Sequence, residues 1–135
     1  MSARILIVED EEKLARFIEL ELVHESYEVK KSGNGREALD IAQDEDFDLI
    51  LLDIMMPDLS GYAVCKILKQ DPATAHIPVI FITALNDEAN EQVGFDLGAV
   101  DYIAKPFRPA LVKARVKNHL SLVQAETLRK TRLQV

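Results

Sequence analysis

The sequence of 135 residues contains a single cysteine, Cys65, and no apolar run long enough to span a membrane. Cys65 has no partner for a disulfide within the chain, and its place in an apolar helical pattern indicates a buried packing role. The apolar run near the amino terminus, Ile5 to Val8, is too short for the core of a signal peptide. Internal repeats and low-complexity linkers are missing as well. We therefore expect a cytoplasmic protein with no membrane contact.

Apolar residues make up 48% of the chain and charged residues 29%, which indicates one globular domain. The net charge of −7 is unevenly spread, because residues 1–107 carry −13 and residues 108–135 carry +6. An acidic body should repel nucleic acid and attract cations. The basic tail could contact an acidic partner or a neighbouring subunit, or could be only the solvated surface of a helix.

Five short apolar runs alternate with segments of helix length, which predicts an α/β fold. The runs are Ile5–Val8, Tyr27–Val29, Leu49–Leu52, Val79–Thr83 and Val100–Ala104. Several are apolar throughout instead of alternating, which is typical of strands covered on both faces. Helix-length connections favour parallel neighbours with right-handed crossovers. The sequence thus predicts an open, doubly wound parallel sheet with helices on both faces.

Polar residues come at the ends of four of these runs. Glu9 and Asp10 follow the first, Asp53 follows the third, and Thr83 and Lys105 end the fourth and fifth. In open α/β sheets the functional crevice lies outside the carboxyl ends of the strands. Carboxylates gathered there repel one another unless a cation neutralises them. Oxygen ligands favour magnesium, or manganese as a substitute, over zinc.

Asp53 is the best nucleophile among these residues, because a carboxylate can accept a phosphoryl group as an acyl phosphate while a metal and a lysine offset the charge. Each residue also has a structural interpretation. Acids after a strand can simply stabilise a helix dipole, and Asp53 could only accept hydrogen bonds from its loop. Thr83 could cap a turn, and Lys105 could be a surface lysine. These interpretations must together explain four coincidences at one sheet edge, which favours the phosphoacceptor.

With these residues placed, the chain resembles the receiver domain of two-component response regulators from Arg4 to about His119. The segments that carry the resemblance are ILIVEDEE, DLILLDIMMPDLSG, IPVIFITAL and GAVDYIAKPF. It implies the flavodoxin-like strand order 2-1-3-4-5, for which a chemotaxis receiver is a known example. It also implies a signalling domain instead of an ordinary enzyme, with self-catalysed phosphotransfer and autodephosphorylation.

The resemblance assigns roles to individual residues. Asp53 is the phosphoacceptor, which takes the group from the phosphohistidine of a sensor histidine kinase or a histidine phosphotransfer protein. Thr83 and Lys105 contact the phosphoryl oxygens. The implied magnesium ligands are Glu9, acting mostly through water, Asp10, Asp53 and the backbone carbonyl of Met55.

The resemblance also implies a relay, in which Thr83 moves toward the phosphoryl group and Tyr102 turns into the vacated space. The responding surface would be the fourth helix, fifth strand and fifth helix, where receivers often form homodimers. Asp101 and Arg115 match positions that some subfamilies pair across that dimer. The Lys105 to Pro106 bond resembles the cis peptide of the family.

The fifth helix should continue past His119, because Ser121 to Val135 contains good helix formers and neither glycine nor proline. We expect a receiver domain over residues 1–120 and a helical extension over 121–135. The extension resembles a signalling helix that leads to an output domain, such as a cyclic-diguanylate enzyme or a histidine kinase. A stand-alone phosphorelay shuttle is the alternative.

Four other functions compete with the receiver. A haloacid dehalogenase-type phosphatase needs a second acid two positions after the nucleophile, where this chain has Met55. A flavin binder needs a hydroxyl-rich loop after the first strand, but Glu9 to Glu12 would repel the flavin phosphate. A receiver-like interaction module that is not phosphorylated is the serious rival. Direct DNA binding has little support, because the body is acidic.

Overall fold

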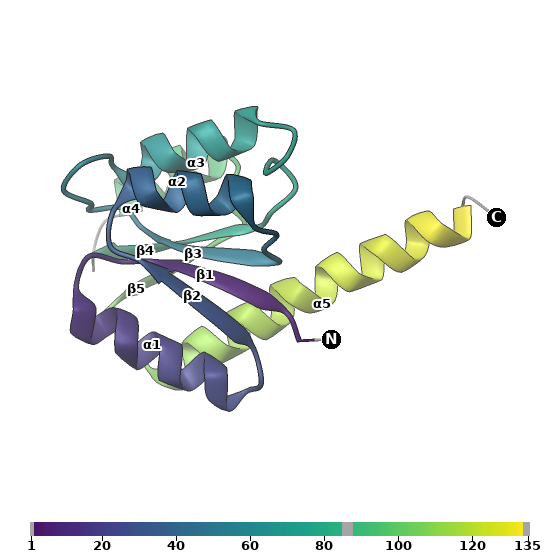
Figure 1. Cartoon of the computed structure of the whole chain (residues 1–135), viewed down its shortest axis with the longest axis horizontal. Helices are drawn as coiled ribbons and strands as arrows, with labels where there is room; N and C mark the ends of the chain where they lie inside the picture. The colour runs from purple at the N-terminus through teal and green to yellow at the C-terminus, as the bar shows by residue number, and fades with distance from the viewer. Residues whose placement is uncertain (1, 85–87, 134–135) are drawn as a thin grey trace.

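A computed structural model describes residues 2–84 and 88–133, and within residues 88–91 and 126–133 it describes the backbone alone. Within these ranges strand and helix alternate five times (Figure 1). The strands are β1 (Arg4–Val8), β2 (Glu28–Ser32), β3 (Leu49–Asp53), β4 (Val79–Ala84) and β5 (Asp101–Lys105). The helices are α1 (Glu12–His24), α2 (Gly35–Asp44), α3 (Gly61–Gln70), α4 (Glu88–Asp96) and α5 (Pro109–Leu133).

The strands form one parallel sheet in the order β2-β1-β3-β4-β5, which confirms the predicted topology. Helices α2, α3 and α4 cover one face of the sheet, and α1 and α5 cover the other (Figure 1). All carboxyl ends of the strands therefore meet at one edge. In this order β1 and β3 are neighbours although two helices and a strand separate them in the chain, so the residues after β1 lie beside the end of β3.

The core lies on both faces of the sheet, as continuous apolar strands predict. All five residues of β3 are buried, and successive residues point to opposite faces. Ile50 and Leu52 pack with residues of α2 and α3, while Leu49 and Leu51 pack with residues of α1 and α5. Asp53, the last residue of this strand, is held in place by a strand that is closely packed on both sides.

Strand β2 differs from its prediction, because the apolar run Tyr27–Val29 gives only part of a strand that spans Glu28–Ser32. The strand lies at the sheet edge and pairs with β1 alone. Lys30 and Lys31 are exposed there, which suits an edge strand that must not pair with other chains. Hydrophobicity alone cannot reveal such a strand. Strand β5 is shifted by one residue from the predicted range.

Side-chain caps fix where two helices begin near the carboxyl edge. The Asn34 side chain accepts a hydrogen bond from the Glu37 amide at the start of α2, and Ser60 accepts one from Ala63 at the start of α3. Such caps satisfy amides that have no partner within the helix. Both helices therefore start at defined points beside the strand ends.

Helix α5 continues without a break to Leu133, and its far end projects away from the sheet (Figure 1). Val112, Val116 and Leu120 are buried against α1 and the sheet, so this apolar seam packs within the body of the protein. Leu122, two residues further on, is 57% exposed. In the part of the chain that the structure describes, no helix is both long enough and apolar enough to cross a bilayer.

Candidate functional site

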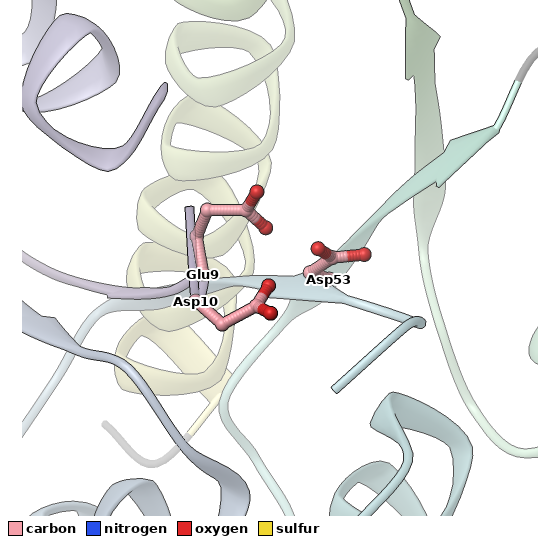
Figure 2. A group of neighbouring side chains, drawn as sticks. All are labelled: Glu9, Asp10 and Asp53. Carbon is pink, nitrogen blue, oxygen red and sulfur yellow. The ribbon is translucent and has the colours of Figure 1, made fainter. Parts of the chain in front are cut away.

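Three carboxylates converge at the carboxyl edge of the sheet. Glu9 and Asp10 follow β1, and Asp53 ends β3, so the neighbouring positions of these strands bring the side chains together. One carboxylate oxygen from each residue lies within 4.8 Å of the others. Figure 2 shows the three groups turned toward a common space. Glu9 and Asp53 are buried, whereas Asp10 is exposed and opens the cluster to solvent.

Lys105, the last residue of β5, supplies the positive charge of this site. Its Nζ lies 3.2 Å from Glu9 Oε1 and 3.3 Å from Asp53 Oδ2. Glu11 Oε2 lies 3.7 Å from the same ammonium, a contact that the sequence reasoning did not assign. The run of acidic residues after β1, Glu9 to Glu12, is the sequence pattern that could have indicated Glu11. One ammonium group is therefore paired with three carboxylates.

This imbalance displaces the pKa values of the buried groups. The pKa of Glu9 is raised to about 8, first by burial and then by the proximity of Asp53, with Lys105 acting in the opposite sense. Burial acts to lower the pKa of Lys105, but the charges of Asp53 and Glu9 outweigh it and raise that pKa. The site is short of positive charge, so an additional cation would stabilise its ionised form.

The donors at this edge fit a divalent cation that prefers oxygen. Among the described residues, Glu9 Oε2 is buried without a hydrogen-bond partner, and buried polar atoms normally have one. Magnesium is held by one or two carboxylates and keeps waters in its other positions, which an exposed Asp10 permits. Met55 follows two residues after Asp53, and its amide donates to Asp53 Oδ1 at 3.0 Å. The role of the Met55 backbone carbonyl as a metal ligand remains a prediction.

Thr83 and Tyr102 lie on the adjacent strands β4 and β5. Thr83 is buried one position before the end of β4, and its hydroxyl donates to the Ala84 carbonyl at 3.2 Å. Tyr102 on β5 is 9% exposed, and its ring lies 5.9 Å from that of Phe81. Tyr102 therefore has the inward orientation in this structure.

Gly94 on α4 makes room for this orientation of Tyr102, which the sequence analysis had not anticipated. A Cβ atom at position 94 would lie 2.0 Å from the Tyr102 hydroxyl. The Phe95 ring packs edge-on against the tyrosine ring at 5.0 Å between centroids. No spacing rule could have indicated Gly94, because its importance depends on the approach of α4 to β5.

Two further expectations concern β5 and its connections. The Lys105 to Pro106 peptide bond is cis, as the resemblance implied. Asp101 and Arg115, expected as possible partners across a dimer, pair within one chain at 3.0 Å. His119 also lies 2.9 Å from Asp101, so these three residues join β5 to α5.

A cleft of about 800 Å³ adjoins the carboxylates between α1 and the connection from β2 to α2. Both acidic and basic side chains line it, as do small polar residues. Its lining comprises Glu9, Asp10, Glu12, Lys13, Ala15, Arg16, Lys31, Ser32, Gly33, Asn34 and Glu37. Molecules in solution therefore have access to the acidic cluster from this side.

Residues 5–117 match the response regulator receiver domain family, and the chain belongs to that family. Receiver domains are the phosphoacceptor signalling domains of two-component systems, and they interact with histidine kinases or phosphotransfer proteins. The chain is 46% identical over 114 residues to the response regulator ArlR of Staphylococcus aureus. That match covers 84% of this chain and 51% of the relative, so the chain spans about half the length of the curated relatives it matches.

Solved structures agree with this membership. A putative response regulator from Chloroflexus aurantiacus is 37% identical, with a TM-score of 0.86 over 90% of this chain and 99% of the other. The receiver domain of a sensor histidine kinase from Pseudomonas aeruginosa is 27% identical, with a TM-score of 0.82 over 90% and 99% of the two chains. That structure holds a magnesium ion coordinated in the active-site cleft.

Proposed function

We propose that Asp53 accepts a phosphoryl group from the phosphohistidine of a partner kinase or phosphotransfer protein. The convergence of Glu9, Asp10 and Asp53 around one space, with Lys105 beside it, is the observation that carries the proposal. Its basis in the sequence is that each of these residues ends or follows a strand at one sheet edge. The rival interaction module without phosphorylation has no need of such a costly collection of buried charge.

The transfer would exchange one bond to phosphorus for another. An Asp53 oxygen forms the new bond as the bond between phosphorus and the histidine nitrogen breaks, and the imidazole leaves with the electron pair and takes up a proton. Lys105 can contact a phosphoryl oxygen, because its ammonium already lies 3.3 Å from Asp53 Oδ2. Thr83 is proposed to contact a second oxygen. Later attack by water at phosphorus would return Asp53 to the free carboxylate.

The metal ligands would be Glu9, Asp10, Asp53 and the carbonyl of Met55, and magnesium is the preferred ion, with manganese as a substitute. When bound, the ion offsets the charge of the carboxylates and of the phosphoryl oxygens. The unpartnered Oε2 atom of Glu9 and the raised pKa of this carboxyl both support a cation at this position. Glu9 would act mostly through a water that it orients toward the ion.

The signal is proposed to pass from Thr83 to Tyr102 and then to the surface formed by α4, β5 and α5. These two residues lie on paired strands and are two register positions apart, because Tyr102 is opposite Phe81 and Thr83 is opposite Ala104. Phe95, Val100 and Leu111, on or beside these elements, are each more than a third exposed. Exposed apolar groups of this kind suit a surface that dimerises when its shape changes.

We further propose that residues 1–120 form the receiver and that 121–135 connect it to an output domain. The continuous α5 helix supports a rigid connection, and relatives twice as long are consistent with an output domain in cis. A cyclic-diguanylate enzyme or a hybrid kinase is the output that we favour. If the receiver instead acts alone, it would serve as a phosphorelay shuttle.

The decisive experiment is incubation with acetyl phosphate and magnesium, followed by intact-mass spectrometry. We expect the mass of one phosphoryl group to be added to the protein and to be lost in Asp53→Asn. Asp48→Asn, which changes an aspartate at the opposite end of β3, is the matched control and should be labelled normally. Full labelling of Asp53→Asn would reject the acceptor, and no labelling of the native chain would favour the unphosphorylated module.

A further inference from the structure

Asp58 lies in the loop between β3 and α3 and reaches across to the first turn of α2. Its Oδ1 accepts a hydrogen bond from the Gly35 amide at 3.0 Å, and its Oδ2 accepts one from the Arg36 amide at 3.1 Å. The sequence separation is 23 and 22 residues, so this is a tertiary contact. It joins the loop that follows Asp53 to a separate helix.

The contact completes the cap of α2. The Glu37 amide donates to the Asn34 side chain at 2.8 Å, and the Ala38 amide donates to the Asn34 carbonyl at 3.1 Å. With Gly35 and Arg36 bound by Asp58 and Glu37 bound by the Asn34 side chain, the first three amides of α2 have partners that the helix itself cannot supply, whereas the Ala38 bond is the first hydrogen bond of the helix. Asn34 is thus the local part of the cap, and Asp58 is the part that comes from another segment.

The two ends of the loop are held by other contacts. The Ile54 amide donates to the Ile82 carbonyl at 3.2 Å, and the Gly61 amide donates to the Ile54 carbonyl at 2.9 Å. A Cβ atom at position 61 would lie 2.3 Å from the Asp53 carbonyl oxygen, so α3 starts directly against the end of β3. Met55 lies between the first of these anchors, Ile54, and Asp58, and it is 74% exposed.

The loop and α2 approach so closely that only glycine fits at the contact. A Cβ atom on Gly35 would lie 2.9 Å from Leu59 Cβ, 3.0 Å from the Leu59 carbonyl oxygen and 2.8 Å from a Val64 methyl group. This fit brings the Gly35 amide within reach of Asp58. Backbone hydrogen bonds from Gly35 and then Arg36 hold the pKa of Asp58 below its usual range, so its carboxylate remains charged at neutral pH.

We propose that Asp58 is a positioning residue for the metal site, because it fixes the loop that carries the Met55 carbonyl against α2. This inference rests on the proposed function, in which that carbonyl is a ligand. Magnesium requires near-ideal octahedral geometry, so a small displacement of one ligand weakens its binding. Partners that orient a ligand without touching the metal influence affinity in this way.

The test compares magnesium binding, measured by isothermal titration calorimetry, in the native chain and in Asp58→Ala. We expect Asp58→Ala to raise the magnesium Kd by roughly tenfold, the lower end of the range for residues that orient a ligand. Asp58→Asn keeps one of the two acceptor oxygens and should recover part of that loss. Circular dichroism and thermal melts establish that each variant is folded at the temperature of the titration.

Two matched variants separate positioning from other effects. Asn34→Ala removes the local part of the same cap and leaves the loop contact, so it should destabilise α2 while changing the magnesium Kd by less than about twofold. Glu37→Gln removes a negative charge from the lining of the adjacent cleft without removing a loop contact. In about 1 M salt, where the Debye length is about 3 Å, its effect should vanish and that of Asp58→Ala should remain.

The outcomes distinguish this inference from the proposed function. Unchanged magnesium affinity in Asp58→Ala, or an equal loss in Asn34→Ala, would overturn the positioning role and leave the metal site intact. A native chain that does not bind magnesium would overturn the proposed function and this inference with it. A selective loss in Asp58→Ala that persists at high salt supports the role of Asp58.

Discussion

Two regions of the molecule hold a carboxylate among charged groups, and their pKa values are displaced in opposite directions. Glu9, at the carboxyl edge, shares Lys105 with two other acids, and its pKa rises to about 8. At Asp101, burial acts to raise the pKa, but contacts with His119, the Tyr102 amide and Arg115 outweigh it and lower the pKa. Similar chemical groups thus serve different purposes according to the balance of charge around them.

The difference indicates which region is arranged for chemistry and which for stability. At Asp101 the protein's own groups neutralise the carboxylate, so nothing further is needed there. At Glu9 the protein leaves an excess of negative charge, which costs stability unless a cation binds. A displaced pKa marks a functional site when the protein itself does not provide the compensating charge.

The largest change in stability should come from Lys105→Ala, which removes the ammonium paired with the three acids. Without magnesium we expect the free energy of unfolding to fall by about 3 kcal/mol, the low end for breaking a buried pair, because the lysine side chain is 29% exposed. Urea denaturation measures this loss. Magnesium should still bind and restore part of the stability, whereas a metal-independent loss would contradict the shared charge balance.

Glu9→Gln should raise the free energy of unfolding instead of lowering it, and the size of this effect should depend on pH. The unfolded carboxyl ionises near 4.5 and the folded one near 8, so the folded state retains a proton in this interval and its relative stability falls as pH rises. At about pH 9 without magnesium, Glu9→Gln should be more stable than the native chain, because ionisation of the buried carboxyl costs the folded state about 1.4 kcal/mol for each unit by which its pKa is raised. Near pH 5 the two should be alike. Urea denaturation at both pH values measures the two free energies of unfolding. A difference between them that does not change with pH would contradict the raised pKa of Glu9.

Asp101→Ala should destabilise the protein by about 1.5 kcal/mol, because it removes charge-assisted hydrogen bonds and leaves Arg115 without this partner. The lowered pKa predicts that this contribution is present above about pH 4 and is lost as the carboxylate is protonated at lower pH. Magnesium should not change the effect. Thermal melts with and without the metal check this, and a strong magnesium dependence would show that the two regions are coupled.

Gly94→Ala tests whether the acidic edge communicates with the surface around Asp101. The added methyl would collide with the Tyr102 hydroxyl, and we expect a net cost of about 1 kcal/mol together with displacement of the tyrosine ring. Phosphorylation of Asp53 should proceed, but phosphorylation-dependent dimerisation, measured by sedimentation, should weaken. Ala99→Gly, outside α4, is the control for packing in this region. An unchanged dimerisation response would argue against a relay through Tyr102.

Much of the fold, and the position of Asp53 within it, can be predicted from local patterns in the sequence. The fully buried strand β3 is visible as an apolar run, and Asp53 is visible as the acid that ends it. Helix-length spacings predict a parallel sheet because chain connections between parallel strands must cross over. Strand β2 was only partly recognised, because Lys30 and Lys31 give its exposed edge no hydrophobic signal.

Tertiary structure alone decided the contacts between segments that are far apart in the chain. The spacing of residues does not reveal that Lys105 reaches Glu11, that Asp58 caps α2, or that Gly94 leaves room for Tyr102. Sequence determines which side chains stand at the strand ends, since local backbone preference and apolar burial act over a few residues. The charge balance at the site depends on distances between strands and loops, and these are set only when the whole sheet and its helices pack together.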